Sequence, residues 1–248
     1  MHIESAAVSH QGRRSNNEDA WVDDGRHGLW AVADGMGGYE GGEVASRIAA
    51  DTLRWFVARN HGDDDVTWPF AIDPARALDE NLLATAVKLA DREIHARRHG
   101  RLRSMGSTVA AVMVRGRDAV VAHVGDSRVY LLRGGTLSQV TRDHSLYAEM
   151  VALGMEVPPK AQFPHANVIT RALGMKPPTE VDVSRVSLRP GDAVLLCTDG
   201  LVESMDDARI AEVLSTRSAP EAARELVHEA LERGTRDNVT VVVLRVAA

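Results

Sequence analysis

Four aspartates stand where apolar, strand-like runs of the chain meet turns. Asp34, Asp126 and Asp199 each follow such a run, and Asp237 shortly precedes another one at 239–244. A carboxylate at a strand end is held rigidly by the sheet and still reaches solvent. Several that converge form an oxygen-rich pocket suited to hard divalent cations. The pattern predicts metal-assisted chemistry.

The turn at 34–38, Asp-Gly-Met-Gly-Gly, is the sharpest local signal. Glycines let the backbone approach a ligand closely, and they leave the Gly35 carbonyl free to bind a cation beside the Asp34 carboxylate. Alone, such a segment is more often an ordinary turn before a helix. Its occurrence with the other three aspartates favours a cation site.

Upstream, the segment 12–19 places Arg13 and Arg14 just before the adjacent carboxylates Glu18 and Asp19. A guanidinium grips a phosphate through paired hydrogen bonds, and neighbouring acids hold water around a cation. By itself the segment is typical of a solvated turn. Together with the aspartates it adds a phosphate-binding group to the candidate site.

Strand patterns with period two and helical patterns supply the elements that must position these residues. We expect strands at 108–114, 119–124, 128–132 and 181–188, one ending at Asp199, and one at 239–246. Helices are expected through 44–57, through 78–94 with Asp73 as N-cap, at 146–153 and at 220–233. Strand runs interrupted by adjacent helices predict an α+β fold: a central antiparallel β-sandwich with helices outside, in α-β-β-α layers.

In an antiparallel sheet the end of one strand lies beside the start of its neighbour. Asp199 and Asp237 are therefore expected to share one rim. Two segments break the pattern of elements: an acidic linker at 62–69, and residues 143–178 with two Pro-Pro pairs. The second predicts an irregular surface excursion able to cover a site.

Composition bounds the class of protein. The 248 residues are 44% hydrophobic and 26% charged, as in an ordinary soluble protein, and one domain is favoured. The net charge of -6 opposes a nucleic-acid role, since the one short basic run, at 97–103, suits a helix end. Cys197 lies in an apolar strand and is expected in the core. We expect a cytoplasmic protein, because no leader or membrane-spanning run is present.

Six motifs in order carry a resemblance to a known family. They are 14–19, 34–38, 106–108, 125–128, 198–201 and 237–240. This series resembles the motif set of the metal-dependent serine/threonine protein phosphatases, the PPM or type-2C family, and Met36 resembles the bacterial branch. The resemblance spans nearly the whole chain. It implies a single catalytic domain at 1–248, with a dinuclear site in a cleft at one edge of the sandwich.

The resemblance also implies the metal ligands. Asp34 would bridge two Mg²⁺ or Mn²⁺ ions, and the Gly35 carbonyl would bind the first. Asp199 and Asp237 would bind the second ion. Asp126, with Asp199, would hold a weaker third ion.

Further roles follow from the same resemblance. Glu18 and Asp19 would act through water, Arg14 would grip the phosphate, and residues 144–176 would form the family's flap. Many relatives carry a histidine, the proposed general acid, at the position of Met36, which cannot donate a proton. His144 and His165 are alternative donors, although exposed loop histidines are the commoner interpretation.

The implied reaction is hydrolysis of phosphoserine and phosphothreonine in proteins by a hydroxide activated between two cations. The rival hypothesis is a catalytically inactive module that binds metal or phosphoproteins, and the retained acidic set argues against it. A cysteine-dependent phosphatase is excluded, because Glu203 stands where an arginine must follow Cys197. We expect a monomer acting on substrates of a bacterial serine/threonine kinase, with no nucleic-acid or membrane partner.

Overall fold

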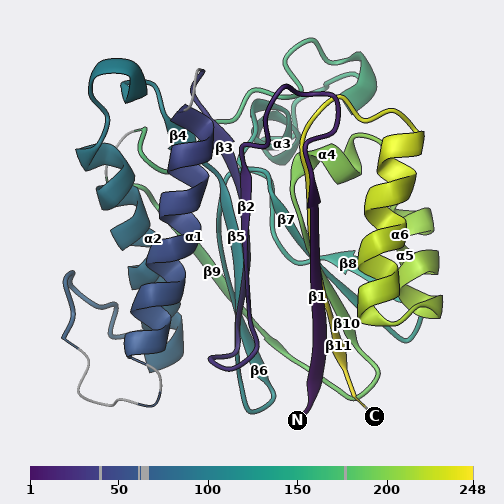
Figure 1. The fold of residues 1–248 in the computed structure, drawn as a ribbon, viewed down its shortest axis with the longest axis horizontal. Coiled ribbons are helices and arrows are strands. Elements are labelled where there is room, and N and C mark those ends of the chain that lie inside the picture. The colour runs from purple at the N-terminus through teal and green to yellow at the C-terminus, as the bar shows by residue number, and fades with distance from the viewer. Residues whose placement is uncertain (39–40, 61, 63–66, 176–177, 248) are drawn as a thin grey trace.

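The computed structural model describes residues 1–38, 41–60, 62, 67–175 and 178–247, which form two antiparallel sheets packed face to face (Figure 1). The first sheet runs in the order β1 (Ile3–His10), β11 (Val239–Val246), β10 (Ala193–Cys197), β7 (Arg128–Arg133) and β8 (Thr136–Gln139). The second sheet runs β2 (Asp19–Asp24), β3 (Leu29–Met36), β5 (Val109–Arg115), β6 (Asp118–Val124) and β9 (Asp182–Ser187), and β4 (Gly106–Ser107) pairs with β3.

Helices cover the outer faces of both sheets. In Figure 1, α1 (Gly41–Arg59) and α2 (Leu78–Ala96) lie on the second sheet, and α5 (Asp207–Thr216) and α6 (Ala219–Glu232) lie on the first. Shorter pieces are α3 (Leu146–Ala152), α4 (Asp199–Val202) and two 3₁₀ turns at Gly100–Leu102 and Lys160–Gln162. The predicted α-β-β-α layering is confirmed.

Alternation along each strand divides the core into three layers. On β3, Leu29, Ala31 and Ala33 pack toward α1 and α2, while Trp30 and Val32 pack between the sheets. Successive side chains of a strand point to opposite faces, so a strand buried on both faces is apolar throughout. This explains why the strand signals in the sequence are continuous apolar runs.

Most predicted elements are found, and some boundaries differ. The final strand has the predicted bounds, but β10 ends at Cys197 and Asp199 begins α4. The predicted N-cap Asp73 is wrong: Ala77 precedes α2, and Asp73 instead accepts a 2.9 Å bond from the Ala75 N–H in the turn before it. Helix α5 was not predicted.

Two predicted irregular segments fall partly outside the described residues. They are the linker at 62–69, of which 63–66 are not described, and the excursion that includes the flap, of which 176 and 177 are not described. Within the described part of the chain, no helix is both long enough and apolar enough to cross a membrane.

Strand direction brings distant segments to one rim of the sandwich. In the second sheet Asp19 pairs directly with Asp34, where β2 begins and β3 nears its end. In the first sheet Cys197 pairs with Val241, where β10 ends and β11 begins. Helix α4 and strand β4 lie at this rim, and the start of β1 lies at the opposite end (Figure 1).

Candidate metal centre

The layer between the two sheets changes from apolar to acidic at the rim. On β3 the side chains facing the first sheet are Trp30, Val32 and then Asp34. Residues paired across an antiparallel ladder lie on the same face, so Asp19 accompanies Asp34 there. The rim thus replaces the apolar core of the sandwich with carboxylates.

Asp19 is tied to the opposite sheet by two hydroxyl groups. Its Oδ2 accepts hydrogen bonds from Thr198 Oγ1 at 3.0 Å and from Thr240 Oγ1 at 2.6 Å. Burial raises the pKa of Asp19 to about 7, although the two hydroxyl bonds oppose the shift. The carboxylate is fixed in position by neutral donors, which leave its charge uncompensated.

Asp34 lies where the charges of the rim meet. Its backbone N–H donates to Thr108 Oγ1 at 3.0 Å, and its carbonyl accepts from the Thr108 N–H at 2.8 Å. Burial raises the pKa of Asp34 well above its ordinary value, and four nearby carboxylates raise it further. They are Asp199, Asp19, Asp126 and Asp237. Every other aspartate of the predicted ligand set therefore acts on Asp34.

Asp199 and Asp237 come together through the pairing of β10 with β11. The Thr198 N–H donates to the Thr240 carbonyl at 3.0 Å, and a Cβ added to Gly200 would lie 2.0 Å from the Asn238 carbonyl oxygen. Burial, followed by the charge of Asp126, raises the pKa of Asp199 well above its ordinary value. The rim predicted for this pair is present.

Asp126 sits on a tight loop after β6 and is 8% exposed. Burial, and then the charge of Asp143, raises its pKa to about 6. Gly125 before it has φ +107°, and a Cβ there would lie 2.6 Å from the Thr108 side chain. His144 holds Gly125 through two hydrogen bonds. The His144 Nδ1 accepts from the Gly125 N–H at 3.0 Å, and the His144 backbone N–H donates to the Gly125 carbonyl at 2.9 Å.

Two glycines let Glu18 and the start of α1 approach the rim. The Gly35 N–H donates to the Glu18 carbonyl at 3.1 Å, and a Cβ on Gly35 would lie 2.0 Å from the Gly42 carbonyl. A Cβ on Gly42 would lie 2.6 Å from the Glu18 carboxyl carbon. Burial raises the pKa of Glu18. Any larger side chain at position 35 or 42 would push Glu18 from the site.

Arg14 reaches the same rim from the loop after β1. Its Nη2 lies 2.6 Å from Asp237 Oδ2, and 57% of its side chain is exposed. The arginine that follows β6 is engaged elsewhere, because Arg128 donates twice to the Asp143 carboxylate, at 2.8 and 2.6 Å. Arg14 thus combines an accessible guanidinium with contact to a predicted ligand.

Three carboxylate oxygens at the rim are buried and have no hydrogen-bond donor among the described residues. They are Oδ1 of Asp19, Asp126 and Asp199. A buried anionic oxygen without a partner is strongly unfavourable, and cations at the rim, with their bound water, would satisfy these oxygens. An all-oxygen, acidic donor set is what Mg²⁺ and Mn²⁺ prefer. The residues present fit such ions.

Sequence reasoning gave no role to several residues that hold the site. Asn238 accepts from the Glu18 N–H at 2.8 Å and donates to the Gln11 and Asn16 carbonyls, each at 2.9 Å, so it pins the loop that carries Arg14. Thr108, Thr198 and Thr240 were likewise not predicted to support the site. Asn238 and the threonines lie inside the motifs quoted above. Their polar side chains, next to the aspartates, could have indicated that they hydrogen-bond the site.

The expectation of exposed loop histidines is correct for His165 and wrong for His144, which is 4% exposed. The His144 ring stacks on His123 at 4.6 Å between centroids, and its Nε2 lies 3.2 Å from Asp182 Oδ2. Burial lowers the pKa of both histidines. His144 therefore supports the Asp126 loop from within the fold.

The trio His123, His144 and Asp182 offers ligand atoms within 4.8 Å of one another, a spacing that could hold a metal. A hydrogen bond already uses one ligand atom of each residue, and His123 Nε2 lies 2.8 Å from the Arg142 carbonyl. The His144 Nδ1 accepts from Gly125, which leaves the ring proton on Nε2, and Asp182 binds Arg171 Nη1 at 2.6 Å. We assign the trio a structural role.

Comparison with known proteins gives one consistent result. The family model described as protein phosphatase 2C matches residues 7–233. The serine/threonine protein phosphatase PstP of Mycobacterium tuberculosis is 38% identical over 242 residues, which cover 96% of this chain and 44% of that protein. The serine/threonine phosphatase stp of Listeria welshimeri is 32% identical over 252 residues, which cover 98% of this chain and 95% of that protein.

A solved structure extends the comparison. The catalytic domain of PstP in complex with two manganese ions is 36% identical, with a TM-score of 0.82 and 99% of each chain covered. The present chain thus spans less than half the length of the first relative and nearly all of the second.

Proposed function

Because the chain belongs to the protein phosphatase 2C family, we propose that it hydrolyses phosphoserine and phosphothreonine in proteins, with divalent cations held at the acidic rim. The observation that carries the proposal is the set of three buried carboxylate oxygens without donors, gathered around Asp34. Such a rim is unfavourable in itself and becomes favourable once cations bind. A fold that maintains it is built for metal-dependent chemistry.

The ligand assignment is the one that the resemblance to the family implies. Asp34 would contact two ions, with the Gly35 carbonyl on the first and with Asp199 and Asp237 on the second. Asp126, together with Asp199, would hold a weaker third ion. Two Mg²⁺ or Mn²⁺ ions would supply Lewis-acid activation of a water molecule at neutral pH.

The chain's own side chains orient the waters of the site and bind the charged phosphoryl group. Asp19 and Glu18 accept hydrogen bonds from waters of the site, and Thr198 and Thr240 fix the Asp19 carboxylate for that task. Arg14 binds the phosphoryl oxygens, since its exposed guanidinium can exchange one anionic oxygen of Asp237 for one of the substrate. Burial excludes bulk water from the carboxylates and strengthens these interactions.

The scope of the proposal covers the whole chain. Residues 1–248 act as one catalytic domain, and 144–176 form a flap beside the rim. The substrates are phosphorylated proteins, made by a bacterial serine/threonine kinase, and the protein acts in the cytoplasm as a monomer without nucleic-acid or membrane partners. Mn²⁺ and Mg²⁺ both fit the oxygen donor set.

The deciding experiment measures phosphate release from a phosphothreonine peptide in Mn²⁺, in Mg²⁺ and in excess chelator. We expect activity in either metal, and its loss in chelator and in Asp34→Asn and Asp199→Asn. The matched control is Asp207→Asn, because Asp207 is an exposed aspartate in the first turn of α5, on the other side of the sandwich from α1 and α2. Undiminished turnover in chelator would refute the proposal.

The alternative, an inactive binding module of the same fold, predicts a different outcome. The wild-type protein would bind Mn²⁺ by calorimetric titration and release no phosphate from any phosphopeptide.

A further inference from the structure

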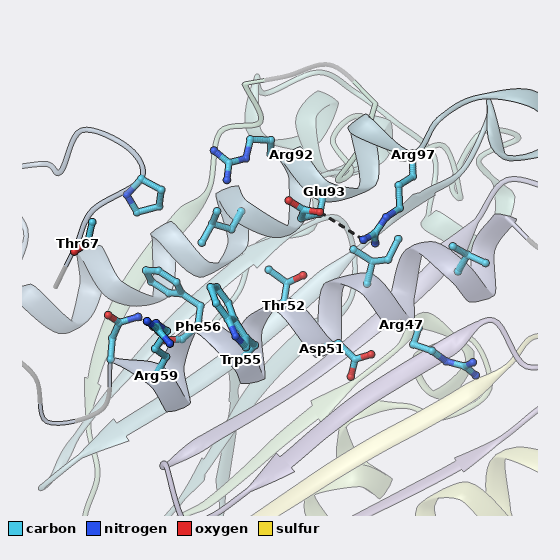
Figure 2. Close-up of a pocket in the computed structure, with 15 residues that line it drawn as sticks. Arg47, Asp51, Thr52, Trp55, Phe56, Arg59, Thr67, Arg92, Glu93 and Arg97 are labelled. Atoms are coloured by element: carbon cyan, nitrogen blue, oxygen red, sulfur yellow. Dashed lines mark hydrogen bonds and ion pairs between the residues drawn. The ribbon is translucent and has the colours of Figure 1, made fainter.

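A groove of about 1140 Å³ lies between α1 and α2 on the outer surface of the helical layer (Figure 2). Apolar side chains from both helices line it: Val44, Ile48, Phe56 and Leu89. Beside them stands Trp55, whose exposure of 58% is unusual for so large an aromatic residue. The groove therefore offers an anchoring place for an apolar side chain.

The charge of the groove is opposite to that of the whole chain. Four arginines line it, namely Arg47, Arg59, Arg92 and Arg97, and two acidic residues, Asp51 and Glu93, so its lining carries 4 − 2 = +2 in a chain of net charge -6. Figure 2 shows Arg47 and Arg59 on α1, Arg92 on α2 and Arg97 just after the C-terminal end of α2. An acidic ligand would be drawn to this surface.

Among the described residues, the present contacts of these arginines are weak or absent; the Arg92 guanidinium lies over the Phe70 ring, 5.2 Å from its centroid. Arg47 pairs with Glu43 at 2.9 Å and Arg97 with Glu93 at 3.6 Å, both between largely exposed side chains one helical turn apart. Such exposed pairs contribute little to stability. Arg59 has no ion-pair partner among the described residues. A ligand carboxylate can thus replace or add to the present contacts.

One end of the groove lies near the rim. Val44 belongs to the first turn of α1, two residues after Gly42, which packs against the Glu18 carboxylate. From Val44 to Arg59 the helix rises about 22 Å, the length of about seven extended residues. A peptide segment lying in the groove would lead toward the candidate metal centre.

We propose that this groove docks an acidic segment of the phosphoprotein substrate, anchored by one bulky apolar side chain. The inference rests on the proposed function and names a substrate feature remote from the phosphorylated residue. Tryptophan and arginine are the residues that contribute most often to binding hot spots, and here they surround an apolar lining. That apolar lining favours a peptide, whose bulky apolar side chain can enter it, over a nucleic acid, whose outer surface is a charged phosphate backbone.

Binding is tested by fluorescence anisotropy with a labelled short peptide of Glu and Asp around one central Phe. We expect saturable binding, weakened about tenfold or more when Lys replaces the acids or Ala replaces the Phe. Arg59→Glu combined with Arg92→Glu, and separately Trp55→Ala, should weaken binding to a similar degree. Arg224→Glu, an exposed arginine on α6, is the matched control and should bind as the wild type does.

Turnover distinguishes this inference from the proposed function. Attaching the acidic segment to a phosphothreonine peptide should lower its KM about tenfold, and the groove variants should remove that gain. Hydrolysis of para-nitrophenyl phosphate with Mn²⁺ should be equal in all these proteins. This substrate has no peptide segment that could extend from the metal centre into the groove. Loss of that hydrolysis in the wild type would instead refute the phosphatase assignment.

Four results would overturn the docking proposal. The first is equal binding of acidic and basic peptides, and the second is tighter binding of a single-stranded oligonucleotide than of the acidic peptide. The third is a concentration-dependent dimer that Trp55→Ala abolishes. The fourth is a large gain in peptide affinity when Asp63, Asp64 and Asp65, which lie outside the described residues, are jointly replaced by Asn. We expect this replacement to change peptide affinity less than about twofold. A large gain would mean that the chain's own acidic stretch occupies the groove.

Discussion

The hydroxyl of Thr240 donates a 2.6 Å hydrogen bond to Oδ2 of Asp19 and thereby joins β11 of the first sheet to β2 of the second. Since that hydroxyl has one proton, the 2.7 Å contact between Thr240 and Ser9 must be donated by Ser9. Ser9 in turn accepts from Asn17 Nδ2 at 2.8 Å. A directed chain of neutral donors therefore ends on a buried carboxylate.

Thr240→Val removes this donor with little change in shape. We expect the free energy of unfolding to fall by about 1–3 kcal/mol, because a buried acceptor loses its partner. Mn²⁺ affinity should fall about tenfold or more, as is usual when a residue that orients a metal ligand is lost. Calorimetric titration and differential scanning calorimetry measure both effects.

Thr240→Ser is the control, because it keeps the donor and should keep both the stability and the Mn²⁺ affinity of the wild type. A valine variant that binds Mn²⁺ as tightly as the wild type would show that the chain of donors does not orient the site.

Asp199→Asn should have opposite effects on stability with and without metal. In chelator the substitution removes a buried negative charge facing Asp126 and Asp237, so the melting temperature should rise by several degrees. With Mn²⁺ present the wild type should gain stability on binding and the variant should gain much less. The measurement is calorimetry of both proteins in each condition. A variant that melts below the wild type in chelator would mean that the rim carboxylates do not repel one another.

The chelated protein should lose stability as pH rises from about 5 to 8. The folded-state pKa is about 7 for Asp19 and about 6 for Asp126, both above the ordinary value of 3.8. In that window the folded state binds more protons than the unfolded state, so the free energy of unfolding falls with rising pH, by about 1.4 kcal/mol for each unit of raised pKa. His123 and His144, whose pKa values are lowered, act in the opposite direction below about pH 6.5.

Melting temperature measured in chelator across this pH range gives the slope. Asp126→Asn should flatten it, since the variant has no carboxyl to titrate at that position. A stability that rises from pH 5 to about 6.5 would contradict the prediction and would indicate that the two histidines dominate in that range.

The sequence was sufficient wherever the argument depended on strand direction alone. Asp199 and Asp237 share a rim because β10 and β11 are antiparallel neighbours, and a two-residue error at the end of β10 did not affect that inference. Helix α5 was missed although Asp206 caps it and Ile210, Val213 and Leu214 have helical spacing. That signal was local and present in the sequence.

Partners set by packing of one sheet on the other could not be predicted in the same way. Thr240 and Asp19 are separated by 221 residues and come from different sheets, so no spacing rule links them. His144 appeared to be a loop residue because its burial depends on His123 and Gly125, which precede it by about twenty residues on another strand and turn. Long-range packing decides which polar side chains are buried and which carboxylate each hydroxyl meets.

Arg14→Ala should separate substrate binding from metal binding. Removing the guanidinium that lies 2.6 Å from Asp237 takes away the proposed phosphate contact, so KM for a phosphothreonine peptide should rise about tenfold or more. Mn²⁺ affinity should stay equal or increase, because Asp237 is released from its ion pair. Arg13→Ala, an exposed arginine at the adjacent position, is the control for local charge and should leave KM within about twofold. Calorimetric titration with Mn²⁺ and steady-state kinetics on the same preparations decide the matter. If Arg14→Ala weakened Mn²⁺ binding and left KM unchanged, Arg14 would be a residue that positions Asp237 and would have no contact with the phosphate.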